Sequence, residues 1–304
     1  MIKAVFNTSF ALIAFAFNSI LCRLALRGEE ADAAGFTAVR LASGAVASVV
    51  IWYLVGRGGD LSGSEGVLDA RTVESGVKNT LPTGRVSAFG SWPSAFFLFA
   101  YAVCFSFAYL GLTAGTGALI LFGAVQMTMI AAAIFKGERP TLVEWCGLVV
   151  AVGGLVYLVF PGLASPPPVS SALMAAAGAS WGIYTLRGRT GGDPLANTTG
   201  NFVRALPFVV LLTLIYLPNL HLSAYGILLA ILSGAAASGV GYTVWYAALK
   251  HLTSTRAAIL QLAVPVLAAV LGIILLAEAA SLRLVVAAAL ILGGIALTIA
   301  GKRR

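Results

Sequence analysis

Two hydrophobic hairpins at a constant spacing constrain this chain more than any other feature. In the first, an apolar run ends near Glu138 and a second run carries a Gly-Gly pair at 153–154. In the second, the run ends at Glu278 and the Gly-Gly pair follows at 293–294, so each part recurs 140 residues later. Because about 20 apolar residues can cross a bilayer as one helix, the repeat predicts a duplicated membrane protein.

The composition agrees with a lipid environment. Of the 304 residues, 60% are hydrophobic and 10% are charged, whereas an ordinary soluble domain carries about a quarter charged residues. We therefore expect an all-α polytopic membrane protein, and the N-terminal run is long enough to be a retained helix instead of a cleaved signal. The ten candidate spans cover about residues 4–26, 33–56, 92–112, 115–136, 141–160, 170–188, 198–217, 224–248, 254–277 and 282–300.

Charge and cysteine content exclude several classes of protein. The net charge is +8, but the basic residues are spread over helix ends and loops, so no nucleic-acid partner is expected. Cys22, Cys104 and Cys146 all fall inside apolar runs and suit packing better than a disulfide or a metal site. No cofactor and no metal are expected.

The distribution of Lys and Arg predicts the orientation. With the N-terminus in the cytoplasm, 14 basic residues lie inside, against Arg23, Arg27 and Arg283 outside. Removing the polar segment 57–91 still leaves 10 against 3. Both termini are therefore expected to be cytoplasmic, in a bacterial-type inner (plasma) membrane, which requires an even number of spans and fits ten.

Two further features divide the chain into halves. Residues 57–91 form a polar segment that we interpret as a cytoplasmic loop, and the Pro-rich stretch 162–170 is a stiff linker at the midpoint. Arg23 and Arg40 are 17 residues apart, as are Arg187 and Arg204. The expected domains are residues 1–163 and 164–304. With five helices each, the second half enters the membrane upside down, as an inverted repeat.

These patterns carry a resemblance to a known family. The segment 135–140, the run 265–278, the Gly-Gly pairs, the segments 179–184 and 17–19, and the two arginines at 40 and 204 together resemble the double EamA domain of the drug/metabolite transporter superfamily. The resemblance covers nearly the whole chain outside 57–91. It implies ten helices, a central cavity between the halves, and export of amino acids or other small metabolites, as in the YddG-type amino acid exporters.

The chain departs from the family pattern at two places. The first half has Val125 where the second has Pro265, so symmetric hinging is not expected, and the 57–91 loop is longer than is usual in the family. We expect Pro265 to lie in mid-helix and to act as a hinge, because proline removes a helical hydrogen bond and kinks the helix.

Candidate substrate contacts are polar or aromatic side chains within the spans. Lipid cannot satisfy amide side chains, which must form interhelical hydrogen bonds or line a cavity. Aromatic residues at helical spacing on the third, sixth and eighth spans suit either packing or an amphipathic cavity wall. We predict a substrate-binding set of Asn18, Tyr101, Gln126, Trp181, Tyr184, Tyr242 and Gln261.

Arg40 and Arg204 are charges placed inside hydrophobic runs. A charge in hydrocarbon costs at least ~2.5–3.5 kcal/mol, so both side chains should face protein or water. They could attract a carboxylate or phosphate. The structural alternative, which we favour about two to one from sequence, is that they cap carbonyl groups or extend to the nearer membrane surface.

The positions of the acidic and histidine residues bear on proton coupling and on catalysis. All eleven acidic residues fall in loops or at helix ends, as do His221 and His251. A proton-coupled multidrug exporter normally needs an embedded carboxylate, which leaves Glu138 and Glu278 as the only candidates if either is drawn inward. A membrane-embedded enzyme acting on lipids needs a nucleophile and base or metal ligands within the helices, which this pattern lacks.

We therefore predict a transporter and not an enzyme. The expected function is export of amino acids with broad specificity, including apolar and aromatic ones, by alternating access without proton coupling. The proton-coupled multidrug exporter and the lipid-modifying enzyme are the alternatives. The expected partners are a small-molecule substrate and the lipid bilayer, and a monomer and a homodimer both stay open.

Overall fold

The structure, a computed structural model, describes residues 2–62, 90–135, 137, 141–160, 165–188, 193–249 and 260–301. Within these ranges the chain is helical apart from turns and one isolated bridge between Ala31 and Leu222. The helices of residues 1–163 are α1 (Ile2–Arg27), α2 (Ala33–Ser62), α3 (Trp92–Ala108), α4 (Ala114–Phe135) and α5 (Leu142–Val159).

The second half continues the helical pattern. It contains α6 (Pro168–Gly188), α7 (Pro194–Tyr216) with the short η2 (Leu217–Asn219), then α8 (Ala224–Ile231), η3 (Leu232–Val240) and α9 (Gly241–Leu249) in one continuous span, followed by α11 (Ala263–Leu276) and α12 (Leu282–Gly301). Each of the ten expected runs thus contains a helix in the described part of the chain.

Six helices of the described residues are long and apolar enough to cross a membrane. They cover Phe6–Arg27, Ala33–Val55, Ala114–Phe135, Leu142–Val159, Leu195–Asn219 and Ala224–Trp245. Shorter apolar helices occupy Trp92–Ala108, Ala263–Leu276 and Leu282–Thr298. The chain is therefore a multi-pass membrane protein by length and composition.

The expected loop at 57–91 is shorter than its sequence suggests. Helix α2 continues through Ser62, because a helix can extend beyond the apolar part of its sequence, and residues 63–89 lie outside the described ranges. At the other end, Gly90 and Ser91 are held against α7. Their amides donate to the side-chain oxygens of Asn197 (3.2 Å) and Asn201 (2.9 Å).

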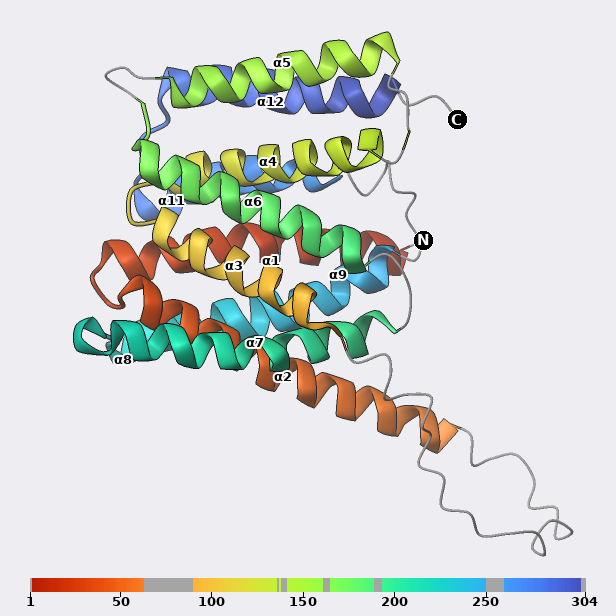
Figure 1. The fold of residues 1–304 in the computed structure, drawn as a ribbon, viewed down its shortest axis with the longest axis vertical. Coiled ribbons are helices and arrows are strands. Elements are labelled where there is room, and N and C mark those ends of the chain that lie inside the picture. Colours follow the sequence, from red (N-terminus) through yellow and green to blue (C-terminus); the bar gives the residue numbers. More distant parts are fainter. Residues whose placement is uncertain are drawn as a thin grey trace, which may run out of the picture.

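Helices from distant parts of the chain lie side by side in the bundle. In Figure 1, α5 and α12 form one end, followed by α4, α11 and α6, and α2 and α7 lie at the other end. Helix α2 packs against α7, α4 against α11, α5 against α12, α3 against α6, and α1 against η3 and α9. The start of α1 and the end of α12 lie on the same edge of the bundle (Figure 1).

One glycine of each Gly-Gly pair serves this packing. A Cβ on Gly294 would lie 2.5 Å from the backbone nitrogen of Ala151, and a Cβ on Gly154 would lie 2.7 Å from Leu290. Gly153 and Gly293 have no such neighbour within 4 Å. The contact between α5 and α12 therefore depends on Gly154 and Gly294, since small residues let backbones approach closely in membranes.

The eighth span changes its helical form in the middle. Residues Leu232–Val240 form a π-helix between two α-helical segments, a feature that apolar periodicity cannot predict. In a π-helix, residues five apart lie one above the other. This register places Ser233 below Ser238, and the Ser238 hydroxyl donates to the Ser233 carbonyl oxygen (2.9 Å).

Candidate functional site

A small cavity lies where helices from both halves meet. It is lined by side chains from α1, α3, α4, α6 and α9, namely Phe15, Asn18, Tyr101, Phe105, Leu121, Phe122, Trp181 and Tyr242. Its volume is about 20 Å³, which is room for about one water molecule. An amino acid would therefore need the helices to move apart before it could enter.

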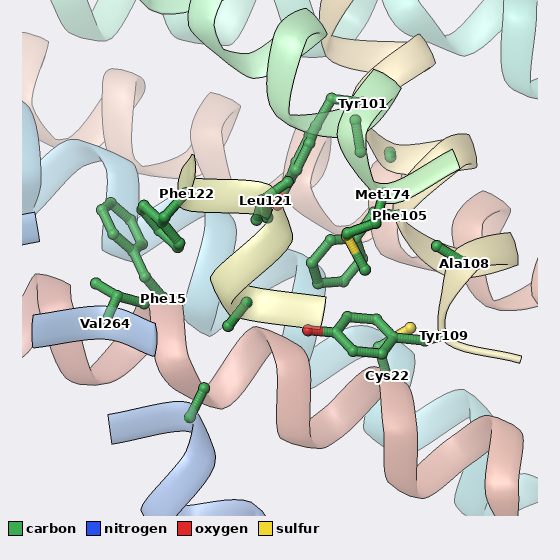
Figure 2. Close-up of a cluster of buried hydrophobic side chains, with 14 of the residues drawn as sticks. Phe15, Cys22, Tyr101, Phe105, Ala108, Tyr109, Leu121, Phe122, Met174 and Val264 are labelled. Carbon is green, nitrogen blue, oxygen red and sulfur yellow. The ribbon is translucent and has the colours of Figure 1, made fainter. Parts of the chain in front are cut away.

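Aromatic rings form most of the cavity wall. The ring of Trp181 lies 4.9 Å from Tyr101 and 4.8 Å from Tyr242 between centroids. Phe15 approaches Tyr242 edge-on at 5.8 Å. Such tilted and edge contacts are the favourable geometry for aromatic pairs. In the buried cluster of Figure 2, Phe15 and Phe122 gather on one side, and Phe105 lies with Tyr109 on the other.

Asn18 supplies a polar group to this wall, and η3 holds it in place. Its side-chain oxygen accepts a hydrogen bond from the Ser233 hydroxyl (2.6 Å), and its side-chain nitrogen donates to the Ser238 hydroxyl (3.2 Å). The π-helical register brings both serines to the same face of η3, toward α1. The irregular helix therefore fixes the orientation of the one amide in the cavity lining.

Arg40 lies within the bundle, immediately behind the cavity wall. Its side chain is 1% exposed, and its Nη2 donates to the Tyr101 hydroxyl at 3.0 Å. The guanidinium carbon lies 5.3 Å from the Tyr101 ring centroid and 4.7 Å from that of Phe105, within cation–π range. Among the described residues, its Nη1 has no hydrogen-bond partner. The expectation that Arg40 reaches a membrane surface or caps a carbonyl is wrong, because α3 covers it with two rings.

Arg204, the matching arginine of the second half, has a different environment. It is half-buried on α7, and its Nη1 donates to the carbonyl oxygen of Gly200, one turn earlier on the same helix (3.3 Å). This is the carbonyl contact that the structural interpretation described. Arg40 and Arg204 thus differ in burial and in partner.

Three predicted contact residues lie outside the cavity lining. Tyr184 is buried behind the wall, where its ring is 5.5 Å from Trp181 and its hydroxyl accepts from the Asn201 side-chain nitrogen (3.5 Å). Gln126 is buried on α4 and Gln261 is half-buried just before α11, and neither lines the cavity. The structure thus brings together four of the seven predicted residues: Asn18, Tyr101, Trp181 and Tyr242.

Pro265 lies just after a one-residue interruption of its helix. Residues 260 and 261 are helical, Leu262 forms a turn with right-handed helical angles (φ −64°, ψ −17°), and α11 begins at Ala263. A proline at 265 has no N–H to donate to the carbonyl oxygen of Gln261, so the helix is interrupted where the expected hydrogen bond is missing.

Sequence reasoning also missed part of the lining. Phe15 precedes Asn18 by three residues, so helical spacing from Asn18 could have found it. Phe105 follows Tyr101 by four residues and belongs to the aromatic stripe expected on the third span, although it was not in the predicted substrate-binding set. Leu121 and Phe122 belong to a helix that is apolar all round, and nothing in its pattern separates their face from the others.

Glu278, one of the two carboxylates that the sequence left as candidates to be drawn inward, has a buried side chain. Its side chain is 7% exposed, and its Oε1 accepts from the Arg23 Nε at 3.2 Å. Its Oε2 accepts from the Ala114 amide at the start of α4 (2.8 Å). The left-handed backbone of Ala277, with φ 50°, turns the chain inward, and a Cβ on Gly272 would come within 2.6 Å of Oε2. Glu278 is thus drawn inward from a helix end, although it does not line the cavity.

Comparison with known proteins identifies the family. The profile of the EamA-like transporter family matches residues 170–300. An uncharacterized protein of Pseudomonas aeruginosa is 46% identical over 300 residues, which cover 99% of this chain and 96% of that protein. An uncharacterized transporter of Archaeoglobus fulgidus is 29% identical over 192 residues, covering 60% of this chain and 67% of its own. This chain belongs to the EamA-like transporter family.

The fold of this EamA-like transporter also resembles a solved crystal structure of a protein that is 20% identical, with a TM-score of 0.60, over 95% of this chain and 98% of that one. In the part of the chain that the structure describes, no group of three His, Cys, Asp or Glu residues could hold a metal ion. The cavity lining offers aromatic rings, tyrosine hydroxyls and one amide, with the Arg40 guanidinium directly behind it.

Proposed function

We propose that this EamA-like transporter exports amino acids, apolar and aromatic ones included, across a bacterial inner membrane. The aromatic cavity is the observation that carries the proposal. Rings such as Trp181 and Tyr242 offer large apolar surfaces to a side chain, while Asn18 and the Tyr101 hydroxyl offer hydrogen bonds to a zwitterion. We propose these four residues as substrate contacts.

We infer that residues 1–163 and 164–304 are inverted repeats. The packing supports this. Counterpart helices pack on each other in three pairs: α2 with α7, α4 with α11, and α5 with α12. The contact of α3 with α6 is matched by that of the span α8–η3–α9 with α1, and the contact of α4 with α6 by that of α11 with α1. Such reciprocity is expected of a pseudo-two-fold axis in the membrane plane.

We propose alternating access, with the end of the bundle that holds Arg23 and Glu278 facing outward. Several polar contacts close this end. Arg23 also donates from Nη1 to the Tyr109 carbonyl oxygen (3.0 Å), and Arg27 donates to that of Leu276 (2.5 Å). Opening the cavity outward would break these contacts, with Pro265 as the proposed hinge. Both termini would then lie in the cytoplasm.

The proposed transport is uncoupled from protons. The buried carboxylate of Glu278 is already engaged by Arg23 and by an amide, away from the cavity. A proton-coupled multidrug exporter is the second candidate, and the burial of Glu278 is the observation in its favour, since embedded carboxylates serve proton relays.

The test is exchange in proteoliposomes. Vesicles containing purified protein are loaded in turn with each unlabelled amino acid, and uptake of labelled phenylalanine is followed with and without a pH gradient. We expect exchange with several apolar and aromatic amino acids in both conditions, and none in protein-free vesicles. Exchange with no amino acid contradicts the substrate class. Exchange that requires the pH gradient contradicts the uncoupled mechanism and turns attention to Glu278.

The proposed orientation has its own test. In a variant without the native cysteines, single cysteines at Ser64 and Ser165 should react with impermeant reagent from opposite sides of the membrane. Reaction of both cysteines from the same side would contradict the proposed orientation.

A further inference from the structure

We propose that Arg40 is the anion-binding group of the transport site and takes the carboxylate of the substrate. The inference rests on the proposed function, which it narrows to substrates that carry a carboxylate. It begins from the burial of a guanidinium whose Nη1 has no hydrogen-bond partner in the part of the chain that the structure describes.

The surroundings of Arg40 stabilise its charge but leave donors free. A guanidinium carries five N–H donors, and the bond from Nη2 to the Tyr101 hydroxyl uses one of them. The rings of Tyr101 and Phe105 interact with the positive charge through their π faces. A π face does not replace a hydrogen-bond acceptor, so a carboxylate oxygen is the natural partner for Nη1.

Among the described residues, no protein carboxylate binds the Arg40 guanidinium. No acidic side chain there makes an ion pair with Arg40, and the buried Glu278 is held by Arg23 and the Ala114 amide. A charge that is 1% exposed is normally paired in a folded protein. An anionic ligand supplies the missing counter-charge.

The cavity gives a ligand access to this group. Tyr101 and Phe105 both line the cavity and flank the guanidinium. A rotation of the Tyr101 ring away from Trp181, as the cavity widens, brings Nη1 to the cavity surface. The carboxylate then binds Arg40, while the substrate side chain lies among Phe15, Trp181 and Tyr242.

This placement predicts which molecules are rejected. Phenylalanine, its carboxamide and phenethylamine share a ring and an amino group, but phenylalanine alone has a carboxylate. Likewise, 3-phenylpropionate has the carboxylate without the amine. We expect the carboxamide and phenethylamine to compete at least about tenfold more weakly than phenylalanine, the change expected when one hydrogen bond to a charged group is lost.

The experiment measures competition by these four compounds against labelled phenylalanine exchange in the full-length protein. In Arg40→Gln, phenylalanine should compete no more strongly than its carboxamide. Arg40→Lys should restore part of the preference for phenylalanine over the carboxamide. Arg204→Gln is the matched control and should keep the wild-type order. Because the ligand series is run on the wild-type protein, the test does not depend on Arg40→Gln folding.

Tryptophan fluorescence measures binding separately from transport. The ring centroid of Trp181 lies 4.9 Å from that of Tyr101, so a ligand bound at Arg40 should change the emission of Trp181. We expect saturable quenching by 3-phenylpropionate in the wild type and its loss in Arg40→Gln. If 3-phenylpropionate binds and no amino acid is exchanged, the export proposal fails and the anion site stands. If phenylalanine is exchanged but the wild type prefers it no more than phenethylamine, export stands and the anion site is wrong.

Discussion

Arg40 and Arg204 occupy matching positions in the two halves, each 17 residues after another arginine, but their environments differ. Arg40 is 1% exposed and bonded to a tyrosine hydroxyl, whereas Arg204 is half-buried and bonded to a carbonyl oxygen of its own helix. The difference comes from the neighbouring helix, because α3 presents Tyr101 and Phe105 to Arg40. Arg40 thus lies directly behind two side chains of the cavity wall, whereas Arg204 bonds to the backbone of its own helix.

The glycines of α5 and α12 show the opposite behaviour. Gly154 and Gly294 lie at matching positions, and both permit close contact with the partner helix. The two halves therefore remain alike where they form the scaffold and differ where they form the cavity.

The largest effect is expected where η3 packs on the backbone beside Arg40. A Cβ on Gly234 would overlap the carbonyl oxygen of Arg40 and the hydroxyl of Ser43. Because a backbone atom cannot move aside easily, Gly234→Ala should lower the free energy of unfolding by about 3 kcal/mol. Gly293→Ala, with open space around it, should be neutral or stabilising by up to ~1 kcal/mol. Thermal unfolding in detergent compares the two, and equal melting temperatures would contradict the close packing around Arg40.

A smaller loss of stability is expected at the ion pair between Arg23 and Glu278. Glu278→Gln weakens the contact to Arg23, and the two side chains are 7% and 17% exposed. The partial exposure of Arg23 reduces the cost below that of a fully buried pair, to about 1–3 kcal/mol. Glu29→Gln makes the same charge change at an exposed residue and should stay within about 0.5 kcal/mol of wild type. Chemical denaturation of both variants measures the difference, and a Glu278→Gln protein as stable as the control would show that this pair is not structural.

The contribution of the second half to the cavity is tested at Trp181. Its ring contacts Tyr101 and Tyr242, so Trp181→Ala should change the exchange rate of phenylalanine relative to alanine by about tenfold. Tyr184→Phe removes a hydroxyl behind the wall and should leave that ratio unchanged. Exchange assays with phenylalanine and alanine measure this ratio in both variants. An unchanged ratio in Trp181→Ala would place substrate selection elsewhere.

The smallest effect is expected in the segment that the second half lacks. Replacing residues 64–88 by a short Gly-Ser linker, with Gly90 and Ser91 kept, should leave exchange within about twofold of wild type, as insertions in connecting segments are usually tolerated. Asn201→Ala removes the acceptor for the Ser91 amide and should cost more, about 1 kcal/mol of stability. A deletion variant that inserts correctly but does not exchange would show that this segment takes part in transport.

Local composition predicted much of this protein. Runs of about 20 apolar residues had to be helices, because lipid offers no partner for an unpaired backbone group. Helical spacing and polarity also identified Asn18, Tyr101, Trp181 and Tyr242 before their positions were known. The same reasoning failed at η3, because a π-helix leaves the apolar run uninterrupted.

The sequence by itself determined that this chain crosses a membrane with several helices, since that requirement acts on each segment separately. Only the tertiary structure decided which residues at matching positions of the two halves have different environments. The burial of Arg40, the inward turn of Glu278 and the place of Phe122 in the cavity wall all depend on which face of a helix meets another helix. In a helix that is apolar all round, the sequence does not mark that face, and interhelical packing chooses it.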